Sequence, residues 1–396
     1  MAGMRYKEFG NTGVELSALG FGAMRLPMKD AAGGKKRVDY DAAVPMMLRA
    51  FELGVNYIDT APFYCDSDSE TAVGMALKSW RDRQQAEQKG KRPVYLSTKN
   101  PSGDGPPGQW RKLLEGSLKK LGRSSIDFYH MWGISLERFQ KYIDVKGGHI
   151  HSALKAKDEG LIKHLSFSFH DKAENMIPLV DSGYFESVLC QYNLLDRSNE
   201  ASMAYARSKG LGVVVMGPVG GGRLGAPSEV IRGMLKKDIK STAEMALRFV
   251  LANDNVNVAL SGMRSIANVE ENAKVASVEG ALSQAELETI NDMLEENKRL
   301  AELYCTGCKY CMPCPQGINI PHVFSLMNYH RIYGLTDHAK KEYAALAIPL
   351  DARENPWAKN DGLDATACIE CRHCEAMCPQ HLKIVDQLKE THAALK

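Results

Sequence analysis

The sequence is short of several features that define common classes of protein. No run of about 18 apolar residues occurs among its 396 residues. The opening stretch, Met1 to Tyr6, has no apolar signal core. The formal net charge is only +2, which gives no reason to expect a nucleic acid or an acidic membrane surface as a partner. These absences predict a cytoplasmic protein that binds neither membranes nor nucleic acid.

Cysteine is scarce over the first three quarters of the chain. Of the 10 cysteines, only Cys65 and Cys190 precede position 305, and the rest fall between positions 305 and 378. No packing argument explains that distribution, and reduced, metal-binding thiols are the natural interpretation in a cytoplasmic chain. Cys65 and Cys190 are expected to pack as small apolar groups.

The clustered cysteines form two motifs, each with four cysteines closed by a proline. They are Cys305-x2-Cys308-x2-Cys311-x2-Cys314-Pro315 and Cys368-x2-Cys371-x2-Cys374-x3-Cys378-Pro379. The second has the spacing of the bacterial ferredoxin run, and the first has one residue fewer before its fourth cysteine. Zinc is the competing interpretation, because Cys-x2-Cys pairs also suit a tetrahedral zinc site. The closing Cys-Pro step favours two [4Fe-4S] clusters.

Strand-like apolar runs alternate with helical segments before the cysteine motifs. The runs are expected at 18–24, 56–59, 93–99, 126–130, 162–169, 187–194, 212–216 and 256–261. Alternation of this kind predicts an α/β fold, and the simplest such architecture with eight strands is a (β/α)8 TIM barrel. We expect the barrel to span residues 1–298, and a small, mainly α-helical, ferredoxin-like domain to span 299–396.

Polar side chains stand at the ends of three successive expected strands. Asp59 ends one run, Tyr64 follows it in a Pro-bearing loop, Lys99 ends the next run and His130 ends the one after. Parallel α/β barrels keep their chemistry at this end of the strands. Because a buried carboxylate is costly without a cation beside it, Asp59 is expected to pair with Lys99.

These four residues, in this order and with the first two five positions apart, resemble the catalytic tetrad of the aldo-keto reductases. The resemblance covers roughly residues 5 to 298. It implies hydride transfer between NAD(P)H and a small carbonyl or alcohol substrate, with Tyr64 as general acid and base. Lys99 would lower the pKa of that phenol, Asp59 would hold Lys99 charged, and His130 would orient the carbonyl by a hydrogen bond.

The same resemblance implies a cofactor site for NADP or NAD. Its members are Ser168, Gln191 and Met216 at the nicotinamide; Gly217, Gly220, Gly221, Arg223 and Leu224 in a Gly-rich loop at the pyrophosphate; and Gly262, Arg264, Asn268, Glu271 and Asn272 at the adenosine phosphate. Phe169 stands where the family has asparagine, and His170 either replaces that amide or is an ordinary loop histidine. The choice between NADP and NAD is left open, because the family's phosphate-binding arginine near Asn268 is absent and Arg264 is the candidate substitute.

The end of the chain resembles two-cluster ferredoxins, in which the fourth cysteine of each motif ligates the other cluster. The implied ligand sets are Cys305, Cys308, Cys311 and Cys378 for one cluster, and Cys368, Cys371, Cys374 and Cys314 for the other. Nicotinamide carries two electrons and a cluster carries one, so a flavin normally intervenes, and no flavin motif is evident. The clusters are therefore expected off the hydride path, either stabilising a small domain or docking a redox protein. The alternative function is a nicotinamide-sensing or electron-transfer module.

Overall fold

The structure is a computed structural model that describes residues 3–31, 35–87, 92–101, 105–234, 239–277, 282–302, 305, 308–348, 362–379 and 381–396. The chain divides into two compact units, each with a core of its own. Unit 1 comprises Met1–Gly221 and Ala246–Leu282, and unit 2 comprises Gly222–Met245 and Ser283–Lys396. Segment 222–245 thus groups with the C-terminal part of the chain. The domain boundary expected after residue 298 stays a prediction.

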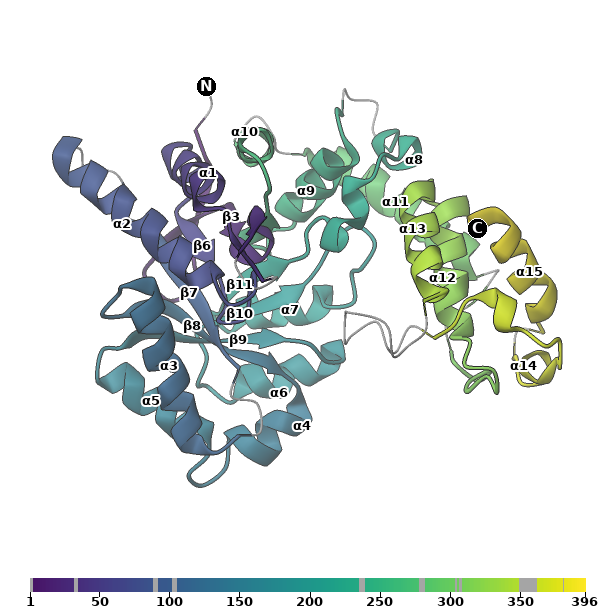
Figure 1. Cartoon of the computed structure of the whole chain (residues 1–396), viewed down its shortest axis with the longest axis horizontal. Helices are drawn as coiled ribbons and strands as arrows, with labels where there is room; N and C mark the ends of the chain where they lie inside the picture. The colour runs from purple at the N-terminus through teal and green to yellow at the C-terminus, as the bar shows by residue number, and fades with distance from the viewer. Residues whose placement is uncertain are drawn as a thin grey trace. The chain divides into compact units, whose positions relative to one another are not determined.

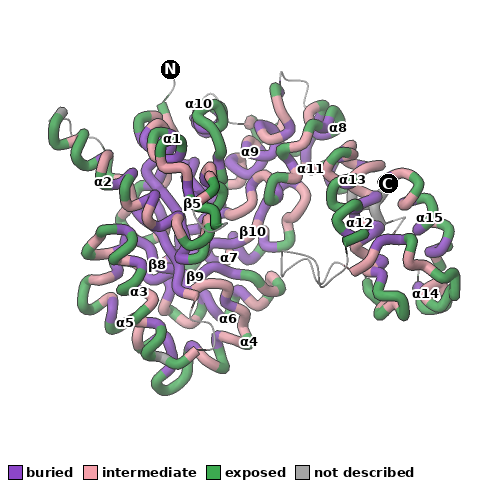
Figure 2. Tube along the Cα trace, in the orientation of Figure 1, coloured by how far each residue is buried: buried purple, intermediate pink, exposed green. Residues whose placement is uncertain are grey.

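Unit 1 is built on a closed barrel of parallel strands (Figure 1). Around the barrel the strands follow the order β10-β11-β12-β3-β6-β7-β8-β9. They are β3 (Leu19–Gly22), β6 (Tyr57–Asp59), β7 (Tyr95–Asn100), β8 (Ile126–Ile134), β9 (Ile162–Phe169), β10 (Ser187–Gln191), β11 (Gly212–Met216) and β12 (Val258–Gly262). The predicted (β/α)8 barrel is confirmed, and its buried strands form the purple centre of unit 1 in Figure 2.

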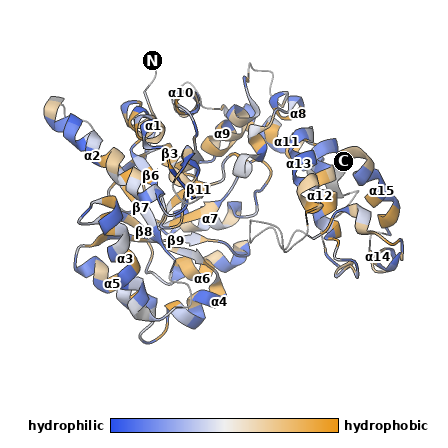
Figure 3. Ribbon diagram, viewed as in Figure 1, coloured by the Kyte–Doolittle hydropathy of each residue, from blue (hydrophilic) through white to orange (hydrophobic). Residues whose placement is uncertain are grey.

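Helices follow the strands along the chain. They are α1 (Tyr40–Glu52), α2 (Ser69–Glu87), α3 (Pro107–Leu121), α4 (Leu136–Arg138), α5 (His149–Asp158), α6 (Met176–Asp181), α7 (Glu200–Ser208), α9 (Thr242–Ala252) and α10 (Ile266–Val275). Helix α1 shows why they form: Ala43, Met46, Met47 and Ala50 recur at helical spacing and are buried. Figure 3 shows the corresponding mixture of orange and blue along the surface helices.

An antiparallel hairpin, β1 (Tyr6–Glu8) and β2 (Glu15–Ser17), precedes the barrel, and β4 (Met28–Asp30) pairs with β5 (Lys36–Val38) after β3. Phe9 and Leu16, from the first hairpin, pack with the barrel residues Tyr57, Phe128 and Val214 in one buried cluster. The rings of Phe9 and Phe128 meet edge to face at 5.1 Å. Apolar side chains therefore fill this part of the barrel, and polar chemistry is confined to the ends of the strands.

Unit 2 is mainly helical. Its helices are α8 (Glu229–Arg232), α11 (Gln284–Glu302), α12 (Ile320–Arg331), α13 (Thr336–Leu346), α14 (His373–Ala376) and α15 (Ile384–Leu395). Val323, Phe324 and Leu326 of α12 share a buried core with Tyr343 of α13 and Leu388 of α15. The predicted helical character of the region after the barrel is confirmed.

The turn after β1 contains two glycines in the left-handed region, Gly10 at φ 56° and Gly13 at φ 71°. A Cβ on Gly10 would lie 2.4 Å from the backbone nitrogen of Gly212, whereas a Cβ on Gly13 would meet nothing within 4 Å. We expect Gly13→Ala to cost about 1–2 kcal/mol of unfolding free energy through strain alone, and Gly10→Ala to cost at least about 2 kcal/mol more. Urea unfolding followed by tryptophan fluorescence measures both, and equal losses would contradict the packing argument.

Candidate active site and cluster sites

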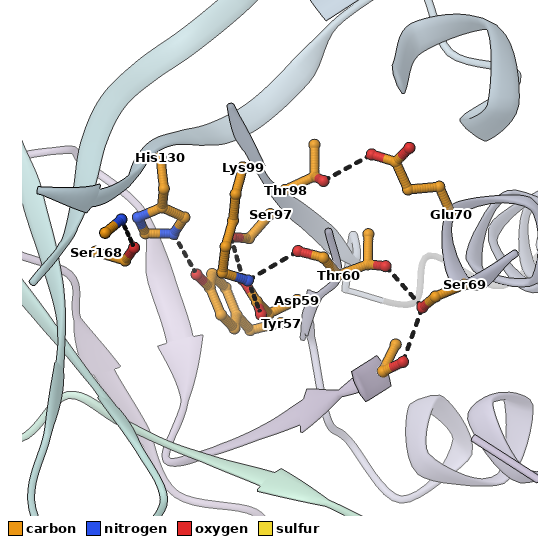
Figure 4. Close-up of polar contacts among 12 residues, drawn as sticks. Tyr57, Asp59, Thr60, Ser69, Glu70, Ser97, Thr98, Lys99, His130 and Ser168 are labelled. Atoms are coloured by element: carbon orange, nitrogen blue, oxygen red, sulfur yellow. Dashed lines mark hydrogen bonds and ion pairs between the residues drawn. The ribbon is translucent and has the colours of Figure 1, made fainter. Parts of the chain in front are cut away.

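Three strands bring Asp59, Lys99 and His130 together at the carboxyl end of the barrel (Figure 4). The parallel register pairs Lys99 with His130. The Lys99 Nζ donates to Asp59 Oδ2 at 2.5 Å and to the backbone oxygen of Thr60 at 2.8 Å. Ser97 Oγ donates to the other carboxylate oxygen at 2.8 Å. The expected ion pair is present, and hydrogen bonds occupy both oxygens of its carboxylate.

Burial and charge act against each other in this pair. Both residues are 2% exposed. Burial acts to lower the pKa of Lys99, but the Asp59 carboxylate and the Tyr64 hydroxyl outweigh it, so the pKa of the amine is raised. Burial also raises the pKa of Asp59, and Lys99 and Ser97 oppose that rise. Lys99 is therefore an ammonium at neutral pH, fixed in position by Asp59.

Tyr64 lies against this ammonium. The Lys99 Nζ is 4.8 Å from the centre of the Tyr64 ring, and Trp132 meets the same ring edge to face at 5.7 Å. Burial raises the pKa of Tyr64, and the Lys99 ammonium lowers it by less than burial raises it. Lys99 thus acts on the pKa in the expected direction, but loss of water around the phenol outweighs the cation and the net shift is upward. Tyr64 carries its proton at neutral pH.

The loop that carries Tyr64 has an unusual backbone. Cys65, Asp66 and Ser67 follow it with φ of 53°, 53° and 69°, a left-handed turn that costs L-residues about 1–2 kcal/mol each. Contacts on both sides hold the loop in place. Asp68 accepts hydrogen bonds from the Val38 amide at 3.0 Å and the Tyr40 hydroxyl at 2.6 Å. The loop therefore fixes Tyr64 at a cost that the surrounding structure compensates.

His130 is fully buried and neutral. Burial, together with the positive charge of Lys99, lowers its pKa to about 3. Its Nε2 lies 3.5 Å from the Tyr57 hydroxyl (Figure 4). A neutral imidazole has one N–H to donate, so His130 can offer a hydrogen bond to an oxygen without giving up a full proton.

The sequence analysis missed Tyr57 and Ser97 as members of the site. Each stands two positions before a predicted residue, Tyr57 before Asp59 and Ser97 before Lys99. Alternation along a strand puts residues i and i+2 on the same face, and that signal could have found both. Thr98 bonds the buried carboxylate of Glu70 at 2.8 Å, a contact between β7 and α2 that no local pattern indicates.

The residues expected at the nicotinamide lie at the ends of β9, β10 and β11. Ser168 accepts a hydrogen bond from the Gly133 amide at 2.8 Å. A Cβ on Gly217 would lie 2.7 Å from Gln191 Oε1, so the Gln191 side chain contacts the start of the Gly-rich loop. Met216 ends β11 and is half-buried. The pKa of His170 is lowered by burial and by Lys99, which places this second histidine in the field of the tetrad.

The expected phosphate-binding residues fall in two places. Gly217, Gly220 and Gly221 adopt φ of 63°, 59° and 67° in the loop after β11. Two residues on, in unit 2, the Arg223 guanidinium donates to the Tyr329 hydroxyl, and Leu224 is buried. Gly262, Arg264, Asn268 and Glu271 are exposed from the end of β12 through α10. Asn272 is buried and donates to Ser261 Oγ at 3.2 Å.

Unit 2 contains two hollows lined by cysteines. One is lined by Cys311, Cys314, Cys368, Cys371 and Cys374. The other is lined by Cys305, Cys308, Cys311 and Cys378. Each hollow thus gathers cysteines of both motifs, and Cys311 lines both, so the ligand sets implied by the ferredoxin resemblance stay a prediction.

The loops around these hollows suit an anionic cluster. Lys309, Glu370 and Arg372, which alternate with the cysteines, adopt φ of 66°, 58° and 58°. Such left-handed residues turn successive backbone N–H groups toward one point, as in many iron–sulfur sites. Burial and the neighbouring Cys305 raise the pKa of Cys311 to about 11. The Cys311 thiol would therefore stay protonated on its own, and a bound metal cluster would hold it as a thiolate.

Comparisons with known proteins agree with both parts of this geometry. A model of the aldo/keto reductase family matches residues 18–295, and a model of a 4Fe-4S dicluster domain matches residues 304–383. L-galactose dehydrogenase of Arabidopsis thaliana is 28% identical over 76% of this chain and 97% of its own length. An uncharacterized oxidoreductase of Schizosaccharomyces pombe is 28% identical over 67% of this chain and 83% of its own.

Solved structures give the same fold. The holo form of an aldo-keto reductase from Bacillus halodurans has a TM-score of 0.60 and 26% identity, covering 73% of this chain and 96% of its own. An aldo/keto reductase from Klebsiella pneumoniae, solved with NADP and acetate, has a TM-score of 0.57 and 23% identity, covering 74% of this chain and 95% of its own. The chain belongs to the aldo/keto reductase family of oxidoreductases, and a 4Fe-4S dicluster domain follows its barrel. None of the helices in the described ranges is long and apolar enough to span a bilayer.

The neutral state of His130 makes stability depend on pH. Its pKa is about 3 when folded and near 6.5 when unfolded, so the unfolded chain binds the extra proton as pH falls below about 6.5. The contribution of neutral His130 to the free energy of unfolding is present above pH 6.5 and is lost as the pH falls toward 3. At pH 5 the free energy of unfolding should be about 2 kcal/mol lower than at pH 7 from this group alone. We expect His130→Gln to remove this part of the loss in urea unfolding. His151→Gln, at an exposed position of α5, should keep it, and the same pH dependence in both variants would contradict the assignment.

Proposed function

We propose that this protein is an NAD(P)H-dependent carbonyl reductase, able to run in reverse on an alcohol, that carries two [4Fe-4S] clusters. One observation carries the proposal. A buried ammonium, held at 2.5 Å by a carboxylate, lies 4.8 Å from the centre of a tyrosine ring at the carboxyl end of the barrel. A purely structural ion pair would not require Tyr64 and His130 beside it.

Tyr64 would act as the general acid. Bound NAD(P)H supplies the hydride, and the carbonyl oxygen then needs a proton. Tyr64 holds one at neutral pH, since burial raises its pKa. When the phenol gives up that proton, an ammonium about 5 Å away stabilises the phenolate by about 3 kcal/mol at an effective dielectric near 20. Lys99 would thus contribute mainly after the proton has left, when the negative charge exists.

The remaining residues would position the reactants. Asp59 would keep Lys99 charged and oriented, and the neutral imidazole of His130 would donate to the carbonyl oxygen. Ser168, Gln191 and Met216 would contact the nicotinamide. The glycines at 217, 220 and 221, with Arg223 and Leu224, would contact the pyrophosphate through backbone N–H groups and charge. The segment with Gly262, Arg264, Asn268, Glu271 and Asn272 would hold the adenosine end.

The clusters would be held by the cysteine sets that line the two hollows, Cys305, Cys308, Cys311 and Cys378 in one and Cys314, Cys368, Cys371 and Cys374 in the other. When bound, a [4Fe-4S] cluster passes single electrons. We place both clusters off the hydride path, because a nicotinamide exchanges two electrons at once. Exposed thiols and clusters suit a reducing compartment, so we propose a cytoplasmic location, which recovery in a secreted fraction would contradict.

A redox protein is the proposed partner of the cluster domain. Tyr310, Ile369 and Met377 stand next to cysteines of the motifs, and their exposed fractions are 64%, 63% and 48%. Exposed apolar side chains beside a redox centre are typical of transient protein contacts. The test measures how fast the reduced clusters are reoxidised with and without added ferredoxin or flavodoxin. An unchanged rate would contradict this role.

Replacing the general acid tests the proposed chemistry. Tyr64→Phe removes only the hydroxyl and is expected to lower kcat/KM for carbonyl reduction by about 10²–10⁴-fold, with cofactor affinity unchanged. The matched control is Tyr205→Phe on α7, whose hydroxyl bonds Asp181 and whose loss should leave turnover unaltered. The panel uses simple aldehydes and aldoses with NADH and NADPH, because the Arabidopsis relative is named for a sugar. Tight cofactor binding by the native protein without any turnover would favour the sensing alternative.

Paired cysteine variants test the ligand sets. Cys314→Ser with Cys371→Ser removes two ligands of one proposed cluster, so about four iron atoms per chain should remain. Cys308→Ser with Cys314→Ser touches both proposed clusters, so much less iron should remain. The opposite pattern of iron and sulfide content would show that each motif holds its own cluster.

The off-path role of the clusters has its own test. With saturating NADPH, we expect Cys378→Ser to keep the native kcat while losing part of its iron. The visible absorbance of the native clusters should stay constant during turnover. A lost kcat in a variant with an intact barrel, or cluster bleaching in step with turnover, would instead put the clusters on the electron path.

A further inference from the structure

Segment 222–245 leads directly out of the Gly-rich loop and belongs to the cluster-bearing unit. We propose that this unit positions the cofactor loop, with Tyr329 as the positioning residue, so that affinity for NAD(P)H depends on cluster loading. The inference rests on the proposed function, because it takes the loop at 217–224 as the contact for the cofactor pyrophosphate.

The first contact holds Arg223, which directly follows Gly222, the last glycine of the loop. The Arg223 Nη1 donates to the Tyr329 hydroxyl, and the guanidinium carbon lies 5.4 Å from the centre of the same ring. The rings of Tyr333 and His338 lie 6.4 and 5.7 Å from that of Tyr329. A charged hydrogen bond to an aromatic group packed in this way is stronger than a neutral one. It fixes the direction in which the chain leaves the loop.

A second contact holds the same segment five residues later. Ser228 Oγ donates to the backbone oxygen of Tyr333 at 2.5 Å and accepts from the Ile231 amide at 3.1 Å, which caps α8. The close approach favours glycine at 334, where φ is +62° and a Cβ would lie 3.3 Å from Val230 Cγ2. Segment 222–245 is therefore held at two points by the C-terminal end of α12 and the turn after it.

Helix α12 connects these contacts to the cluster sites. Its first residues, Ile320 and Pro321, line the hollow of the Cys305 set together with Phe324, and Ile320 also lines the other hollow. The 12 residues of the helix span about 18 Å, with Tyr329 near the far end. A cluster held by the cysteines of these hollows would lie near the first turn of α12, because Ile320 lines both hollows, and its removal would leave that turn less supported. The change would reach Tyr329 through one rigid helix.

Ordering the loop affects cofactor affinity through entropy. The glycines at 217, 220 and 221 adopt left-handed conformations that other residues avoid, and a free glycine loop loses much conformational freedom when it closes on a ligand. Arg25 Nη2 already donates to the Gly221 oxygen at 2.7 Å on the barrel side. Holding Arg223 restricts the direction in which the chain leaves the glycines, which lowers the entropy cost of ordering them when the cofactor binds.

The test compares cofactor affinity in two tyrosine variants with clusters loaded. NADPH and NADH are titrated by fluorescence into the native protein, Tyr329→Phe and Tyr333→Phe. We expect Tyr329→Phe to raise Kd about tenfold, equivalent to ~1.4 kcal/mol, with kcat at saturating cofactor unchanged. Tyr333→Phe is the matched control: its hydroxyl bonds no residue within the described ranges, and the backbone oxygen that accepts from Ser228 is kept. It should bind like the native protein.

Two further arms show whether the effect runs through Arg223 and α12. In an Arg223→Gln background, Tyr329→Phe should add nothing to Kd. Cluster-free protein prepared with a chelator should show the same rise in Kd as Tyr329→Phe. If Tyr329→Phe itself loses iron, Ser228→Ala removes the second contact from the segment side and should raise Kd in the same direction.

The outcomes separate this inference from the proposed function. A native Kd in Tyr329→Phe, or in Ser228→Ala where that variant is needed, overturns the inference and leaves the reductase proposal standing. So does a native Kd in the cluster-free protein. Failure of the native protein to bind either NADPH or NADH contradicts the proposed function itself.

Discussion

Inside the mouth of the barrel, the ammonium of Lys99 and the carboxylate of Asp59 are held together out of water, and the geometry around Tyr64 depends on this pair. Neither charge would be tolerated alone at 2% exposure, because burying an unpaired ion costs several kcal/mol. Paired, they cost less, and the Thr60 oxygen and Ser97 hydroxyl complete their hydrogen bonds. The barrel thus keeps a permanent positive charge beside a phenol. Burial keeps Tyr64 protonated, and the Lys99 ammonium would stabilise the phenolate that forms when the proton leaves.

The cluster domain meets a different constraint. Its core contains two hollows that eight cysteines line together with apolar side chains such as Ile320 and Phe324. A cluster held by thiolates from both motifs, as we propose, would crosslink the start and the end of the domain and so add stability to its packing. The same helix, α12, borders both hollows and carries Tyr329. The cysteine-lined hollows and segment 222–245 therefore share one structural element.

Much of the fold was accessible from the sequence because the barrel repeats a local pattern. The strands at 162–169 and 212–216 have the predicted bounds, and 212–216 is the continuous apolar run typical of a buried parallel strand. The other strands shift by a few residues, as at 256–261, where β12 begins at Val258. The tetrad and the cysteine motifs were predicted from residue order and spacing along the chain. Tyr57 and Ser97 could have been predicted as well, because each stands two positions before a predicted residue of its strand. The bond between Arg223 and Tyr329 could not, because its partners are 106 positions apart and leave no local signal.

The sequence by itself determined the alternation of strands and helices, the polar residues at three strand ends and two sets of four thiols. Each of these features depends on residue type and on spacing along the chain, so local patterns in the sequence are enough to predict it. Only the tertiary structure decided the direction in which the pKa of Tyr64 is shifted, since that depends on how far burial outweighs the nearby cation. It also brought cysteines of both motifs into each hollow, and it grouped segment 222–245 with the unit that holds the cysteines. Those outcomes depend on distances between residues far apart in the chain, which spacing along the sequence does not encode.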